Sequence, residues 1–184
     1  FLPVTPGTKY ITVGGAVASD VHGKNHHSEG SFSRHVDALT IYTPAKGLVT
    51  CSKTEYADLF WATCGGMGLT GLILTVTFKL KRIESAYISQ KQVKAVNLDE
   101  ILHLFEENKA YTYSMAWIDC LKRGNSFGRS ILIVGEHAKT ADLTGKARQA
   151  PLLLPKKMEL TMPFNLPSFA LNPLSIKAFN ALYY

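Results

Sequence analysis

The pattern of apolar and polar positions in the first eighty residues predicts several short strands. Side chains alternate between apolar and polar over residues 37–43 and 48–52, and a Pro-Ala-Lys-Gly stretch at 44–47 separates the two runs. Alternation of this kind on either side of turn residues is typical of a β-hairpin. A mostly apolar run through residues 73–78 predicts a further strand.

Helix signals lie on either side of this predicted hairpin. Residues 11–13 form a β-branched run that stops at glycines 14 and 15, and we expect a short strand there. The small residues 16–23 that follow are mildly helical and end on a glycine, which can adopt a positive φ. Thr54 can cap a second helix, which ends at the glycine-rich residues 64–68.

The second half of the chain has a different order of elements. Residues 87–96, 111–119 and 130–135 each read as a strand. A helix lies between the first two strands, because Asn97 is a capping residue, Glu100 follows three positions later, and apolar residues then recur on one face. The β-α-β-β order predicts an antiparallel sheet with a helix on one side.

The composition changes near residue 82, and no dense glycine cluster recurs beyond it. We therefore expect two domains, residues 1–82 and residues 83–184. Four prolines between residues 137 and 167 predict a long connector with little regular structure. Asn172-Pro173 is a typical start for a last helix.

Composition bounds the class of protein. The 184 residues carry a formal charge of +6, with 46% hydrophobic and 18% charged residues, which excludes an intrinsically disordered chain. Three widely spaced cysteines without a C-x-x-C motif support neither a disulfide framework nor a zinc ribbon. They favour a reducing compartment, so we expect a cytoplasmic protein or one attached peripherally to the inner membrane. The chain begins without Met and ends on an apolar run, and we expect a fragment of a larger protein.

Positive charge alone also permits a non-catalytic basic module that binds nucleic acid or a protein partner. The basic residues are scattered, however, and their densest groups, residues 79–82 and Lys156-Lys157, fall far short of a nucleic-acid-binding arm. Tyr111 and Tyr113 are a faint version of the paired aromatics of an RNA-binding sheet. Diffuse charge suits anionic small molecules or an anionic membrane surface at least as well, and we expect no nucleic-acid partner.

Four of the six histidines fall between residues 22 and 35. A metal site is one interpretation, but His26 and His27 are adjacent and no acidic or cysteine ligand recurs at helical spacing, so we expect none. A polar loop bonded to its own backbone is another. We favour a loop that faces a cofactor, because glycines at 14–15 and 65–71 allow backbone amides to approach phosphate oxygens. Neither glycine cluster is a dinucleotide-binding or P-loop motif.

Taken together, these segments resemble the second half of the FAD-binding domain of vanillyl-alcohol-oxidase-type (PCMH-type) flavoproteins. The resemblance is carried by residues 12–16, 20–27, 30–32, 59–71 and 113–117. The His-Gly-Lys-Asn-His-His string at 22–27 is similar in particular to that of the bacterial decaprenylphosphoryl-ribose 2-oxidases, FAD-linked sugar oxidases of cell-wall biosynthesis. The fold implied is α+β: residues 1–82 as the second lobe of the FAD-binding domain, and residues 83–184 as part of an antiparallel-sheet substrate (cap) domain.

The resemblance also implies an activity, the oxidation of a secondary hydroxyl of a sugar-type substrate by hydride transfer to FAD. The substrate would be a polyprenyl-phosphosugar or an aldonolactone, and a reductase is a candidate partner protein. His22 would lie near the flavin and take a hydroxyl proton, Lys24 would take part in catalysis and bind substrate phosphate, and Trp117 would contact substrate. The expected cofactor contacts are Gly7, Thr12, Val13, Gly14, Gly15, Ser19, Asp20, Val21, His22 and Ile73.

Overall fold

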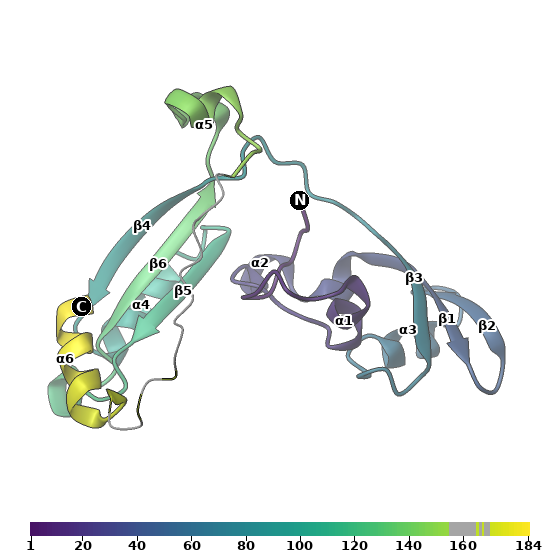
Figure 1. Cartoon of the computed structure of the whole chain (residues 1–184), viewed down its shortest axis with the longest axis horizontal. Helices are drawn as coiled ribbons and strands as arrows, with labels where there is room; N and C mark the ends of the chain where they lie inside the picture. The colour runs from purple at the N-terminus through teal and green to yellow at the C-terminus, as the bar shows by residue number, and fades with distance from the viewer. Residues whose placement is uncertain (155–164, 166, 168–169) are drawn as a thin grey trace. The chain divides into compact units, whose positions relative to one another are not determined.

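The computed structural model describes residues 1–154, 165, 167 and 170–184. The chain separates into two compact units, Phe1–Ile83 and Glu84–Tyr184. Each unit contains one three-stranded antiparallel sheet together with helices (Figure 1). The predicted α+β class, with an antiparallel sheet in the second half, is confirmed. The roles of the two units as FAD-binding lobe and cap domain stay predictions.

The sheet of the first unit is built around the predicted hairpin. Strands β1 (Val36–Thr43) and β2 (Gly47–Ser52) pair antiparallel, with Ile41 opposite Val49. Strand β3 (Leu72–Phe78) pairs with the other edge of β1, which gives the order β2-β1-β3. The alternation of side chains therefore predicted the hairpin correctly, and the apolar run at residues 73–78 predicted the third strand.

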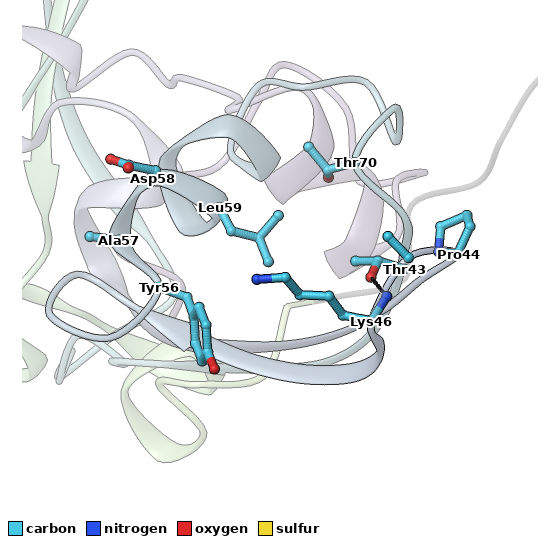
Figure 2. A pocket seen from close by; sticks show the side chains of 9 residues that line it. Thr43, Pro44, Lys46, Tyr56, Ala57, Asp58, Leu59 and Thr70 are labelled. Atoms are coloured by element: carbon cyan, nitrogen blue, oxygen red, sulfur yellow. Dashed lines mark hydrogen bonds between the residues drawn. The ribbon is translucent and has the colours of Figure 1, made fainter.

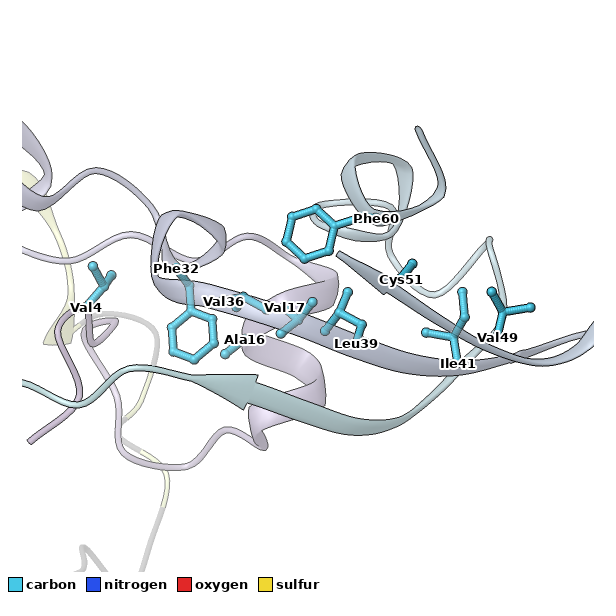
Figure 3. Packing of buried hydrophobic residues seen from close by; sticks show 10 residues of the cluster. All are labelled: Val4, Ala16, Val17, Phe32, Val36, Leu39, Ile41, Val49, Cys51 and Phe60. Carbon is cyan, nitrogen blue, oxygen red and sulfur yellow. The ribbon is translucent and has the colours of Figure 1, made fainter. Parts of the chain in front are cut away.

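Two short helices cover one face of this sheet. Helix α1 (Val13–Ala18) contacts β3, and helix α3 (Ala57–Thr63) contacts β2. A four-residue helix, α2 (His26–Glu29), and a 3-10 turn, η1 (Phe32–His35), connect α1 to β1. The core consists of Val4, Ala16, Val17, Phe32, Val36, Leu39, Ile41, Val49, Cys51 and Phe60 (Figure 3).

The strand predicted at residues 11–13 is wrong, because Val13 already belongs to helix α1. Thr12 is the N-cap of that helix, and its Oγ1 accepts a hydrogen bond of 3.0 Å from the backbone N–H of Gly15. A side chain that satisfies one of the free amides of the first turn outweighs the β preference of a three-residue run. The glycine pair lies inside the first turn of α1, and no strand precedes it.

The predicted cap of α3 is also wrong. Ser52 Oγ accepts hydrogen bonds from the backbone N–H groups of Thr54 and Glu55, at 3.2 and 3.0 Å, and so forms a turn. The helix starts only at Ala57, after Tyr56 in a left-handed conformation with φ of 46°. This competing turn moves the capping position from Thr54 to Tyr56, so the helix begins at Ala57.

The second unit has the predicted order of elements, namely β4 (Ile88–Ala95), α4 (Leu98–Glu107), β5 (Tyr113–Ile118) and β6 (Ser130–His137). Strand β6 lies between β4 and β5 and is antiparallel to both. Asn97 caps α4 by accepting a hydrogen bond of 3.0 Å from Glu100 N. Helix α4 packs Ile101 onto Leu132 and Val134 of β6, so the helix lies on one side of the sheet as predicted.

Short helical turns interrupt the segments between the main elements. They are η2 (Gly124–Ser126), η3 (Thr140–Asp142) and α5 (Gly145–Gln149). The remainder of the predicted connector, apart from residues 165 and 167, lies outside the described residues. The last helix, α6 (Pro173–Tyr183), begins at Asn172 with a capping box, as predicted. Within the ranges that the structure describes, no helix combines the length and the apolar character needed to cross a membrane.

A buried ion pair joins α6 to the sheet of the second unit. Asp119, 2% exposed, lies just beyond β5 and contacts Arg129 Nη2 through Oδ2 at 2.6 Å. Asn180 of α6 donates to Asp119 Oδ1 at 2.6 Å, and Leu121 N donates to the same oxygen at 3.1 Å. Burial raises the pKa of Asp119, but the hydrogen bonds from Arg129, Asn180 and Leu121 and the charge of Arg129 together bring that pKa below its usual value.

Candidate functional site

The C-terminal end of α1 lies against the glycine-rich loop of residues 65–71. Gly65 N donates to Val17 O at 3.0 Å, and Met67 N donates to Ala18 O at 2.8 Å. Ser19 Oγ lies 3.7 Å from Met67 Sδ. The helix that carries the first glycine pair is therefore joined at its C-terminal end to the second glycine segment by backbone hydrogen bonds. That they face a common cofactor stays a prediction.

Asp20 fixes the turn that follows α1. Its backbone has a φ of 40°, which is unusual for a residue with a side chain. Its carboxylate accepts hydrogen bonds from Ser31 Oγ and Ser33 N, both at 2.8 Å. Both oxygens are thus engaged within the protein, and the contacts described for Asp20 are structural.

His22 lies on a short segment that pairs with residues 31 and 32. It forms an isolated antiparallel bridge with Ser31, and Phe32 N donates to Val21 O at 2.9 Å. Its ring lies edge-on to that of His26, with the centroids 5.3 Å apart. The side chains of His22 and Lys24 are both exposed.

Gly23 and Asn25, on either side of Lys24, pack against the first residues of the chain. Asn25 is 1% exposed, and its Nδ2 donates to Pro3 O at 2.7 Å. A Cβ on Gly23 would lie 2.6 Å from Thr5 O, so this position admits only glycine. The polar side chain of Asn25 and the bare backbone of Gly23 therefore set the path of the loop that carries His22 and Lys24.

The other predicted cofactor residues fall into two groups. The exposed group comprises Gly7, Thr12, Val13, Gly15 and Ser19, and Gly14 is half-buried between them. Val21 and Ile73 instead pack against the core, where they hold α1 and β3 together. Trp117, the predicted substrate residue, belongs to the second unit. Its ring contacts that of Tyr183 in α6, with the centroids 4.9 Å apart.

The histidines of the first unit are not gathered around one point. His35 Nε2 lies 3.0 Å from the carbonyl oxygen of Glu29 and 3.8 Å from its carboxylate. Among the described residues, no group of three or more histidine, cysteine, aspartate or glutamate side chains is arranged to hold a metal ion.

Cys64 lies next to the turn that Asp20 forms. Burial raises the pKa of its thiol to about 11, and the negative charges of Asp20 and Cys51 act in the same direction. The positive charge of Lys53 lowers the pKa and offsets only part of this rise. Cys64 is therefore a protonated thiol at neutral pH and a poor nucleophile. Both it and Cys51 are free of disulfides.

A cavity of about 620 Å³ lies between the hairpin turn and α3 (Figure 2). No sequence pattern predicted this cavity. Lys46 extends its ammonium over the ring of Tyr56, 5.1 Å from the ring centre. Asp58, Leu59 and Thr70 complete much of the lining. These residues come from three segments with no shared motif, so only the tertiary structure brings them together.

Gly71 directly follows Thr70, which lines this cavity, and its position leaves no room for a side chain. Its φ is 148°, and a Cβ would lie 2.3 Å from the carbonyl oxygen of Tyr42. We expect Gly71→Ala to lower the free energy of unfolding by about 2–5 kcal/mol, because β1 would have to move. Gly68→Ala is the control, since a Cβ there meets nothing within 4 Å at a φ of 81°. It should cost only ~1–2 kcal/mol of left-handed strain. Equal losses in urea denaturation would contradict the close approach.

Comparison with known proteins identifies relatives across the whole chain, although no family model matches. The chain is 38% identical over 188 residues to the decaprenylphosphoryl-β-D-ribose oxidase of Mycolicibacterium smegmatis, covering 100% of this chain and 41% of that protein. It is also 38% identical over 168 residues to an uncharacterised protein of Streptomyces coelicolor, covering 91% and 45% respectively. An FAD-linked oxidoreductase of Aspergillus terreus is 26% identical over 106 residues, covering 54% and 21%. The chain thus spans less than half the length of these curated relatives.

Proposed function

Because the chain belongs to the FAD-linked oxidase family, we propose that it is part of an FAD-dependent oxidoreductase acting on a secondary hydroxyl of a sugar-type substrate. The observation that carries this proposal is the contact between the end of α1 and the glycine-rich loop, beside an exposed His22. Small residues on both segments leave the backbone open to close approach by a large planar cofactor. The Phe1–Ile83 unit would then supply one wall of the flavin site.

The surface of α1 would leave room for an FAD group. A Cβ placed on Gly14 meets nothing within 4 Å, so the surface of α1 is open at that point. The neighbouring exposed residues Thr12, Gly15 and Ser19 carry short or no side chains. Residues of this kind would hold the cofactor mainly through backbone groups and hydroxyls. FAD, when bound, supplies the hydride acceptor.

Two exposed side chains would do the chemistry that the cofactor does not. The imidazole of His22 would accept the proton of the substrate hydroxyl, which a neutral histidine can do near neutral pH. The ammonium of Lys24, two residues away, would bind an anionic substrate group such as a phosphate. The buried Asn25 and the bare backbone of Gly23 would hold both side chains in place.

The finer assignment is a polyprenyl-phosphosugar substrate, with an aldonolactone as the alternative. Two observations support the first: the Mycolicibacterium relative is named for a decaprenylphosphoryl-ribose, and Lys24 presents an exposed cation. Trp117 of the Glu84–Tyr184 unit would contact the substrate, and a reductase would be a partner protein. Reduction of the bound flavin by each substrate class, followed by absorbance, would separate the two assignments.

Gly14→Val tests whether FAD binds against the surface of α1. The Cβ of the added side chain has open space in the folded protein, and the side chain would occupy the surface proposed for FAD. We expect FAD affinity to fall by about tenfold or more with thermal stability nearly unchanged. Ala178→Val, on the exposed surface of α6, is the control and should leave FAD affinity unchanged. Full FAD affinity in Gly14→Val would place the cofactor elsewhere, and no FAD binding by the unmodified chain would favour a binding module over an oxidoreductase.

A further inference from the structure

Three consecutive leucines are displayed on the surface of the Glu84–Tyr184 unit. Leu152, Leu153 and Leu154 are 63%, 70% and 57% exposed. A run of exposed leucines is costly in water, and adjacent exposed apolar residues commonly mark an interaction site. We call residues 152–154 the leucine tip.

The backbone of the leucine tip is anchored to the start of the sheet. Ala86 N donates to Pro151 O at 2.9 Å, and Tyr87 Oη donates to Leu153 O at 3.3 Å. A third bond, from Leu153 N to Ala150 O at 3.0 Å, closes a turn. The turn is thus fixed through its main chain, and the leucine side chains are left with little protein to pack against.

The segment around the leucine tip is strongly basic. Residues 139–157 contain five lysines and arginines and only one acidic residue. Lys146 and Arg148 lie on helix α5, directly before the tip, and both are exposed. Lys139, which is also exposed, precedes the 3-10 turn η3. Apolar side chains next to a basic surface match the two layers of an anionic membrane surface, its acyl chains and its head groups.

We propose that the leucine tip and the basic residues of α5 form a docking site for an anionic lipid bilayer. The leucines insert into the boundary of the acyl chains, while Lys146 and Arg148 reach the anionic head groups. The charge argues for lipid over other occupants, because the exposed leucines of α6 lack such neighbours. Leu174 and Leu182 of α6 are 78% and 88% exposed, yet Lys177 is the one charged residue of that helix. This docking site does not depend on the proposed flavin chemistry.

Vesicle binding by the full chain tests the docking site. The probe is vesicles of phosphatidylcholine with about a quarter phosphatidylglycerol, and binding is measured by co-sedimentation. Changing all three leucines of the tip to serine should weaken binding by about tenfold or more. Lys146→Gln with Arg148→Gln should weaken it by a similar factor, since each basic residue near the surface contributes about fivefold. The remaining binding should then depend less on salt.

The matched control changes Leu171, Leu174 and Leu182 to serine, which removes the same number of exposed leucines without touching the tip. It should bind the vesicles like the unmodified chain. Circular dichroism reports whether each variant is folded. If the leucine variant does not fold, the Lys146/Arg148 variant still tests the proposal. Unchanged binding by both tip variants would overturn the proposal. Equal binding of the unmodified chain to vesicles of pure phosphatidylcholine would also overturn it. The same holds if the leucine variant loses self-association but still binds the vesicles.

Discussion

His22→Ala is expected to slow the reduction of flavin by substrate by about 10²–10⁴-fold, the usual contribution of a positioned proton acceptor. Flavin content should change far less, because the proposed cofactor contacts are spread over α1 and the glycine-rich loop. The exposed imidazole contributes no buried packing that alanine would remove. Flavin absorbance gives the occupancy, and stopped-flow absorbance gives the reduction rate in the same preparation.

His103→Ala is the control for this experiment. His103 lies on α4 in the other unit, and its exposed ring forms an ion pair of 3.1 Å with Glu107. Its replacement should leave the rate of reduction unchanged. Equal rates in His22→Ala and the unmodified protein would make His22 a structural residue. Loss of flavin with an unchanged rate per bound flavin would make it a cofactor-binding residue instead.

Asp119→Ala is expected to lower the free energy of unfolding by about 3–5 kcal/mol, because it leaves the buried Arg129 guanidinium without its counter-ion. The substitution also removes the acceptor of the Asn180 hydrogen bond, which ties α6 to the sheet. Urea denaturation measures the loss. Asp142→Asn, at an exposed position of η3, is the control and should change stability by less than about 0.5 kcal/mol. A loss of similar size in both variants would show that the ion pair stabilises nothing.

The ionised carboxylate of Asp119 should also make the free energy of unfolding depend on pH. The pKa of Asp119 is lower in the folded protein than in the unfolded chain, where it is about 3.9. Its contribution is therefore complete above the unfolded value and is lost as the pH falls through the folded value. Between neutral pH and about pH 3, the unmodified protein should lose more stability than Asp119→Asn. Parallel curves would contradict the role of the ionised carboxylate.

Local pattern predicted most of the elements and failed where a side chain competed for the backbone. The hairpin at Pro44–Gly47 and the cap of α4 at Asn97 both follow from short-range rules, and the structure has both. The run at residues 11–13 was read as a strand, although the Thr12 hydroxyl had the geometry to cap a helix. In the same way, Ser52 bonds the amides after it and moves the start of α3 beyond Thr54.

The sequence by itself determined the class of most elements, the order of the strands along the chain and the motif that indicates an FAD-linked oxidase, since each depends on residues within about ten positions of one another. Only the tertiary structure decided which candidate residues lie together. The loop with Met67 joins Ser19 through contacts across 48 positions, and Asn25 reaches back to Pro3. It also decided that Asp20 is engaged within the protein while His22 is exposed. These contacts depend on long-range packing, which produces no periodic pattern in a sequence.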